Sequence, residues 1–343
     1  MTLTARGRLS LFRIVVCVVI ASMSAPAAAQ QPPRDMVRRF TVEQWDQFRP
    51  LFKLVEQAAA GQPVPSDMTL AWQCHVLKAE SNVDLTLFTL KVVNGEFTSF
   101  PLAMYLRVVK HGAPAPAPGP RDALAQYPFE DVAFFDKPSD GRISRAFVAP
   151  AGQWDVYVAL RGAATLDMPF PQTVVFKQEV DLPDLSTDLA VSSLIVADKV
   201  EADLENKRLD FEDQLDQPYR LWGARITPAL ETRFGHGMKL SVVFLVYNTG
   251  VAANDKPDVE IDYSFFQKMG TSERFLGGTN SQSLNPETLR PDFSLAAGDL
   301  LVAGQDMPLD RFPDGDFRLE IKVTDNTSGK SLTRDVNFTV AGH

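Results

Sequence analysis

The sequence is poor in cysteine. It holds two cysteines, Cys17 and Cys74, among 343 residues. If Cys17 is removed with an N-terminal leader, Cys74 has no partner and the chain contains no internal disulfide. Stability must then come from buried apolar surface, and the length suffices for two domains that each own a core.

Histidine is also scarce, and the usual catalytic motifs are missing. The four histidines are His75, His111, His236 and His343, and no HExxH zinc motif occurs. Cys74 adjoins His75, but adjacent strand residues point to opposite faces, so the two would not bind one metal ion and we expect both to be structural. GxSxG and a convincing SxxK are also lacking. Catalysis is therefore the least favoured class of function, and we expect a protein that is not an enzyme.

Basic residues are fewer than acidic ones. The chain has 34 Lys and Arg against 43 Asp and Glu, a net charge of −9. Loss of Arg6, Arg8 and Arg13 with a leader would make the remainder more acidic still. Such a chain repels the phosphate backbone, so nucleic acid is not an expected partner.

Long hydrophobic runs are confined to the amino end. The basic leader MTLTARGRLSLFR precedes the apolar run IVVCVVIA, and small residues follow up to Ala29. This order predicts a secretory signal peptide over 1–29, cleaved after Ala29. The run is shorter than the roughly 20 residues of a membrane span, and no later run reaches that length, so no transmembrane segment is expected after cleavage. We expect export to the periplasm or the extracellular space.

Residues 30–65 combine a polar lead with one amphipathic helix. The stretch TVEQWDQFRPLFKLVEQAAAG begins with a capping residue, Thr41, and ends at Gly61. Pro50 should kink or split the helix. Apolar residues recur at spacings of three and four, which predicts a face that packs on the protein's own domain; they are Trp45, Phe48, Phe52 and Val55.

From Met68 the apolar period changes to two, which indicates strands. We assign 66–182 to a first β-sandwich domain, 183–217 to an acidic connector and 218–343 to a second β-sandwich domain. The Pro-rich stretch 112–120 should be an extended loop. KLSVVFLVYN (239–248) is apolar on both faces, as expected of a strand covered on each side.

Recurrent short strands separated by turns, without alternating helices, indicate a mainly β chain. The predicted fold is a pair of antiparallel immunoglobulin/fibronectin-III-like β-sandwich domains preceded by a short helical segment.

The letters GKS near the carboxyl end resemble part of a phosphate-binding loop. Such a loop needs a glycine five residues before Gly329, where Thr324 stands, and a helix after the lysine. Instead, alternating apolar residues lie on both sides of the turn DNTSGK. The pattern predicts a β-hairpin.

Two surfaces are candidates for binding. Asp310, Asp314 and Asp316 crowd one stretch, DRFPDGDF, which does not fit the EF-hand spacing but leaves a loop-bound calcium open; no other cofactor is expected. Phe266 follows Phe265 on a predicted strand, so one of the two must face away from the core. That residue would serve a binding platform, a contact between domains or the second face of a covered strand.

Trp222 is the second aromatic candidate for a binding surface, beside a core role that is the default for tryptophans next to strands. Paired carboxylates for glycosidase chemistry cannot be assigned among the many acids.

Several pieces of the sequence carry a resemblance to a known family: EDVAFF, ISRAFVAPAGQWDVYVALRG, DLPDLSTDLAVSSLIVADKV, PALETRFG, LSVVFLVYN, KPDVEIDYSF and FPDGDFRLEIKVTDNTSGKSLTRDVNFTV. They resemble uncharacterised exported bacterial β-sandwich proteins, with tails like those next to GWxTD and VWFA-related domains. The similarity covers most of the chain from about residue 66. The chain has neither the GWxTD tetrad nor the DxSxS metal motif of a VWFA domain, so the resemblance implies fold and export but no activity.

These observations favour a non-catalytic exported interaction or scaffold protein of the cell envelope. Its partner would be an envelope protein or a glycan. The alternative is a glycan- or calcium-binding envelope protein that uses one sandwich surface.

Overall fold

The computed structural model of the chain describes residues 40–65, 68–79, 83–113, 127–138, 140–203, 205, 209–251 and 255–342. The expected signal peptide and most of the Pro-rich stretch 112–120 lie outside these residues. The described part is mainly β, with several antiparallel sheets preceded by a helical segment, as predicted. None of its helices is long and apolar enough to cross a membrane.

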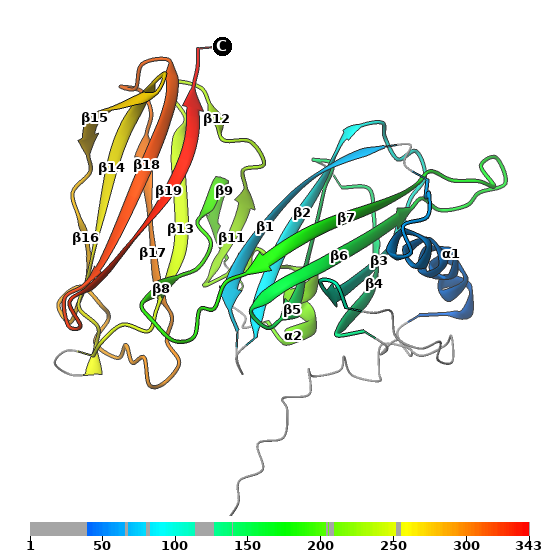
Figure 1. Ribbon diagram of the computed structural model, residues 1–343, viewed down its shortest axis with the longest axis horizontal. Helices are drawn as coiled ribbons and strands as arrows, with labels where there is room; N and C mark the ends of the chain where they lie inside the picture. The colour runs from blue at the N-terminus through cyan, green and yellow to red at the C-terminus, as the bar shows by residue number, and fades with distance from the viewer. Residues whose placement is uncertain are drawn as a thin grey trace, which may run out of the picture.

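The first seven strands form two facing sheets, β1-β2-β5 and β4-β3-β6-β7, seen at the right of Figure 1. We call this pair of sheets the first body. Its strands are β1 (Thr69–Lys78), β2 (Asp84–Asn94), β3 (Leu102–Lys110), β4 (Phe129–Phe135), β5 (Arg142–Ala149), β6 (Gly152–Arg161) and β7 (Thr173–Leu182).

The remaining strands form a second body, at the left of Figure 1, from the sheets β10-β11-β9-β13-β17 and β12-β19-β18-β14-β15. β8 and β16 pair with β13 and β14 outside these paths. The strands are β8 (Ala190–Val191), β9 (Ile195–Ala202), β10 (Arg220–Leu221), β11 (Ala224–Pro228), β12 (Arg233–Phe234), β13 (Lys239–Tyr247), β14 (Val259–Met269), β15 (Ser272–Gly278), β16 (Gln282–Leu284), β17 (Leu301–Pro308), β18 (Gly315–Asp325) and β19 (Lys330–Val340).

Both bodies repeat one strand order. In the first body, strands one, two and five form one sheet, and strands four, three, six and seven form the other. The seven principal strands of the second body do the same, as β9-β13-β17 and β15-β14-β18-β19. The pairing of β12 with the end of β19 is parallel and departs from the antiparallel pattern that we predicted.

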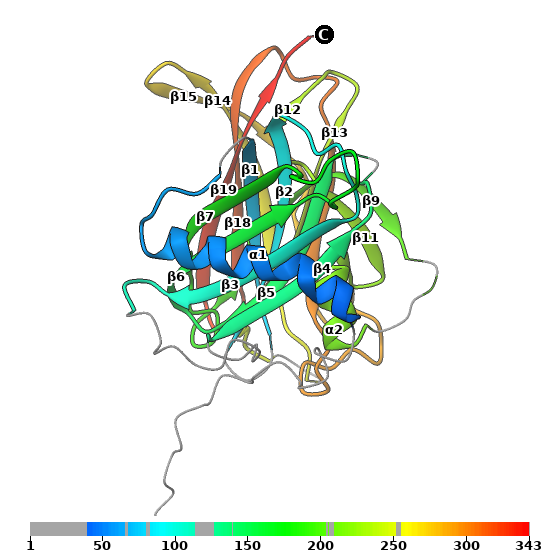
Figure 2. The same ribbon diagram turned by 90° about the vertical axis from the view of Figure 1, so that its right-hand side faces the viewer.

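Helix α1 (Val42–Ala59) lies across the outer face of β4-β3-β6-β7, as Figure 2 shows. Thr41 caps it through a capping box with Gln44, which satisfies two otherwise unpaired N–H groups. Phe48 and Leu51 are fully buried against Tyr105 and its neighbours on the sheet. The helix is not split at Pro50, because this packing holds both halves on the same sheet.

The carboxyl-terminal hairpin matches its prediction. β18 and β19 pair in register from Gly315–Val340 to Asp325–Lys330. Gly329 takes φ +71° in the turn, a conformation that glycine adopts at little cost. The letters GKS therefore belong to a turn and the start of a strand.

β13 is apolar on both faces for the reason that its sequence indicated. Val242 and Phe244 lie in the core of the second body, whereas Leu245 and Tyr247 lie in an apolar cluster shared with the first body. A strand in this position needs no polar face.

The segment 183–217, interpreted as a connector, contains regular structure. It carries β8, β9 and α2 (Phe211–Asp216), and β9 lies between β11 and β13. Ile195 and Ala197 of β9 are buried, while its second half, from Asp198 to Ala202, is exposed and charged. That mixed pattern explains why β9 looked like part of a solvated segment.

The two bodies meet through β1, β2 and β5 of the first and α2, β9, β11 and β13 of the second. Polar contacts accompany the shared apolar cluster. Arg142 donates to the Pro228 carbonyl at 2.6 Å and pairs with Asp198 at 2.8 Å. His75 Nδ1 lies 2.8 Å from the Tyr219 hydroxyl. Cys74 points to the opposite side, against the core of the first body, as their adjacent positions predicted.

Candidate functional site

The outer face of β15-β14-β18-β19 is turned away from the first body (Figure 1). Phe265 and Phe266 point to opposite sides of β14. Phe265 is 5% exposed in the core of the second body. Phe266 is half-buried on the outer face, where the Arg318 guanidinium lies 4.4 Å from its ring centroid. Phe266 therefore lies neither between the bodies nor under a covering sheet.

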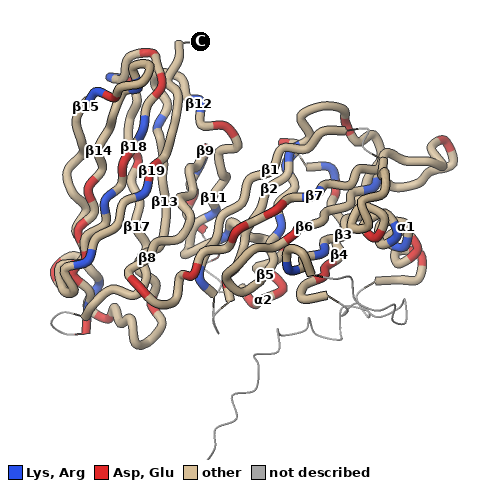
Figure 3. The backbone as a smooth tube through the Cα atoms, viewed as in Figure 1, with Lys and Arg blue, Asp and Glu red and all other residues tan. Residues whose placement is uncertain are grey.

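Arg318 is the centre of a charged network on this face. It forms hydrogen bonds to Glu273 at 2.8 to 3.1 Å, to Glu320 at 2.8 Å and to Asp335 at 2.7 Å. These carboxylates raise the pKa of Arg318, and its hydrogen bonds lower the pKa of Glu273. The network fixes the guanidinium over Phe266. Figure 3 shows the alternation of charged residues along these strands.

Beside this network, the β14–β15 hairpin exposes an apolar strip formed by Phe266 and Phe275. The rings of Phe266 and Phe275 are 5.5 Å apart. Phe275 is 60% exposed, Met269 55% and Leu276 38%. β15 is an edge strand, and Figure 2 shows the hairpin reaching beyond the rest of its sheet. An edge strand with apolar side chains is a ready template for another strand.

The sequence contains a signal for the position of Phe275 in the turn that precedes it. Met269 pairs with Ser272, so Gly270 and Thr271 form a two-residue turn. Such a turn fixes the register of a hairpin, and this register places Phe275 opposite Phe266.

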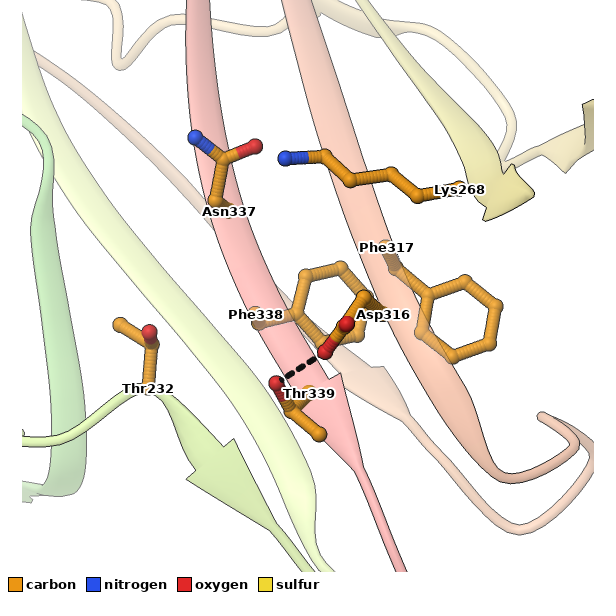
Figure 4. A pocket seen from close by; sticks show the side chains of 7 residues that line it. All are labelled: Thr232, Lys268, Asp316, Phe317, Asn337, Phe338 and Thr339. Atoms are coloured by element: carbon orange, nitrogen blue, oxygen red, sulfur yellow. Dashed lines mark hydrogen bonds between the residues drawn. The ribbon is translucent and has the colours of Figure 1, made fainter. Parts of the chain in front are cut away.

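A shallow hollow of about 150 Å³ lies on the same face, near the end of the hairpin (Figure 4). Asp316 accepts a hydrogen bond from the Thr339 hydroxyl at 2.6 Å, and Lys268 extends toward Asn337. The remaining lining residues are Thr232, Phe317 and Phe338. Both phenylalanines are buried in the core, so the hollow offers polar groups and no exposed aromatic face.

The three candidate calcium ligands do not converge. Asp314 accepts hydrogen bonds from His236 Nε2 at 2.7 Å and from the Gly342 amide at 2.9 Å. Asp316 is bound by Thr339, and Asp310 lies in the exposed turn after β17. The Asp314 carboxylate joins two loops, and the Asp316 carboxylate joins β18 to β19.

Another set of potential ligands does converge in the described part of the chain. Ligand atoms of His111, Asp155 and Glu179 lie within 4.8 Å of one another on β3, β6 and β7 or beside them. Lys177 Nζ lies 3.2 Å from Asp155 and 3.3 Å from Glu179, so an ammonium group already balances the carboxylates. A hydrogen bond to Asp155 raises the pKa of His111. The set is an ion-pair network of the protein itself.

Trp222 lies in the turn between β10 and β11. It takes φ +54° and Gly223 takes φ +75°, the pattern of a type I′ hairpin turn. Its side chain is half-buried and packs against the apolar cluster shared by the two bodies. The contacts of Trp222 are those of a core residue and not those of a free binding surface.

No protein-family model matches the chain, and no curated protein matches it. Similar solved structures include trypsin-activated alpha-2-macroglobulin from Escherichia coli, with 14% identity, a TM-score of 0.22, and coverage of 81% of this chain and 17% of that one. The native conformation of the same protein gives 11% identity, a TM-score of 0.21, and coverage of 81% and 16%. The chain thus spans about one sixth of the length of these proteins.

Proposed function

We propose that the chain is a non-catalytic interaction protein of the cell envelope, exported by the secretory route and built from two fibronectin-III-like sandwich domains. The observation that carries this proposal is the apolar strip of Phe266 and Phe275 on the β14–β15 hairpin, with Leu276 exposed beside it on the edge strand β15.

Strand order supports the domain assignment. Immunoglobulin-like sandwiches place their first, second and fifth strands in one sheet, and their third, sixth and seventh strands in the other. Both bodies follow this rule and put the fourth strand beside the third. Folds of this kind commonly present edges and end loops to partner proteins, though the function must come from the site itself.

The partner that best fits the β15 edge is a protein supplying an extended strand. The edge offers unpaired backbone groups, and Phe275 and Leu276 offer side-chain contacts on both faces of the strand. Glu273 and Arg318 flank the strip and would fix the register by charge.

The experiment is a quantitative pull-down from envelope extract with the immobilised full chain. Replacing Phe275 by Ser should reduce the captured partner at least about ten-fold, the effect of losing one central anchor. The control is Phe211→Ser, since Phe211 is 47% exposed on α2, far from this edge. Equal capture by both variants would contradict the proposal.

The alternative, a glycan ligand, is favoured by the polar hollow between Lys268, Asp316 and Asn337. Amide, carboxylate and ammonium groups can hydrogen-bond sugar hydroxyls. Binding of an envelope oligosaccharide that is lost in Asn337→Ala and kept in Phe275→Ser would favour this alternative. Calcium can be tested with the same protein, because binding to the folded state would raise its melting temperature.

A further inference from the structure

The end of the first body opposite the second body carries a projecting loop, residues 162–172, between β6 and β7. Figure 1 shows it extending beyond α1 as the part of the molecule farthest from the second body. Leu166 is 104% exposed and Phe170 is 91% exposed, more than any other large apolar side chain in the described residues. Single exposed apolar residues are common, but two in one loop that are each more than 90% exposed need an explanation.

Hydrogen bonds brace the loop at its tip and at its base. Thr165 and Met168 exchange two backbone hydrogen bonds of 3.1 Å across a tight turn. At its base, the Gly162 amide donates to Gln172, and the Gln172 side chain exchanges hydrogen bonds with Thr98 of the β2–β3 loop at 2.8 and 3.1 Å. The apolar side chains are therefore presented by a braced support, which lowers the entropy lost on binding.

The β2–β3 and β6–β7 loops also approach each other closely at their bases. A Cβ on Gly162 would meet the Ser99 side chain and lie 3.1 Å from the Ser99 carbonyl oxygen, so a larger residue at 162 would require Ser99 to shift. In sandwiches with this strand order, these two loops lie at the same end and are used for recognition in antibody variable domains.

We propose that this loop is a second binding site, distinct from the β15 edge, and that it inserts Leu166 and Phe170 into an apolar pocket with a basic rim on a partner protein. A convex loop with apolar tips requires a concave occupant. Asp167 lies between the two anchors and the loop contains no Lys or Arg. The acidic chain, of net charge −9, complements a basic rim and disfavours a second copy of itself.

A bilayer is the less suitable occupant. Membrane-binding loops and helices pair their apolar residues with Lys and Arg, which anionic headgroups attract. Here an acid occupies the position between the anchors.

The test places a photo-crosslinking residue at position 166 of the full chain, with position 211 on α2 as the control. After irradiation in envelope extract, position 166 should give a discrete protein adduct that position 211 does not give. Excess wild-type chain should reduce that adduct at least about ten-fold, whereas excess Leu166→Ser/Phe170→Ser chain should not. Phe275→Ser should compete like wild type, which separates this site from the β15 edge.

Three results would overturn the proposal. One is an equal adduct yield at positions 166 and 211. Another is sedimentation with phosphatidylethanolamine/phosphatidylglycerol vesicles that the double variant abolishes, which would assign the loop to membranes. The third is a wild-type dimer in analytical ultracentrifugation that becomes a monomer in the double variant. Both side chains are solvent-exposed, so the double variant should fold normally, and its melting temperature checks this.

Discussion

His75 shows how one residue can report on the contact between the two bodies. Its ring is 3% exposed and bonded to the Tyr219 hydroxyl, and burial lowers its pKa to about 4. Protonation in the folded protein would leave a charge without water around it, so the ring stays neutral well below the range in which an unfolded histidine titrates.

The lowered pKa of His75 predicts that the protein loses stability in acid. The contribution of His75 is complete above about pH 6.5, where folded and unfolded states are both neutral. As pH falls toward about 4, only the unfolded state binds the proton, so the free energy of unfolding should decrease by about 3 kcal/mol. Urea unfolding of His75→Gln should lack this slope. His236→Gln, which changes an exposed histidine outside the contact, should keep it; a parallel slope in all three proteins would contradict the prediction.

Asp84 should act in the opposite direction. It is 5% exposed, and burial together with the charge of Asp184 raises its pKa to about 7. A raised folded-state pKa gives stability that is complete below about pH 4 and is lost as pH rises through 7. Asp84→Asn should therefore unfold at higher urea than wild type at pH 8 and at a similar concentration at pH 4. Asp181→Asn, an exposed change, is the control, and no difference at pH 8 would refute this reading.

At the scale of elements, strict alternation of apolar and polar residues decided which parts of the fold could be predicted. The β18–β19 hairpin has one solvent-exposed face and one buried face, so its strands and turn can be predicted from the sequence alone. β9 was missed because only its first half is buried, and because its partners β11 and β13 are distant in the sequence. A local sequence pattern does not indicate which distant strands a segment will pair with.

The candidate site was predictable to the same extent. Alternation showed that Phe265 and Phe266 point apart, but not that Arg318 would cover Phe266, since this contact joins separate strands. The aspartates Asp310, Asp314 and Asp316 are close in sequence, yet Asp314 and Asp316 accept hydrogen bonds from His236 and Thr339 in different directions. Sequence proximity does not bring carboxylates to one point.

Equivalent sheets of the two bodies differ in what covers them, which leads to an element-scale prediction. α1 covers β4-β3-β6-β7 through Leu51, which is fully buried, whereas β15-β14-β18-β19 presents Lys322 and other polar residues to solvent. Leu51→Ala should lower the free energy of unfolding by about 2–5 kcal/mol. Lys322→Ala should change it by less than about 0.5 kcal/mol. Comparable effects in urea unfolding would mean that α1 adds little to the first body.

At the scale of the whole molecule, the contact between the bodies decides whether they behave as one unit. Leu245 and Tyr247 of β13 share an apolar cluster with Leu77 and Leu87 of the first body. The Val76 amide donates to the Ser193 hydroxyl at 2.8 Å, and Arg142 bonds across the same contact. Large apolar contacts of this kind couple neighbouring bodies, whereas polar ones leave them free to move.

The chain should therefore unfold in one cooperative transition, with equal calorimetric and van't Hoff enthalpies. Leu245→Asp places a charge in the shared cluster without touching the separate cores, because Leu245 faces the first body while Phe244 faces the second. Burial of an unpaired charge is costly, so the contact should open and the calorimetric trace should split into two transitions. Leu245→Met, which keeps volume and polarity, should leave a single transition. Two transitions in the wild-type chain would show that the bodies are thermodynamically independent, and the acid sensitivity assigned to His75 would then belong to local opening of the contact.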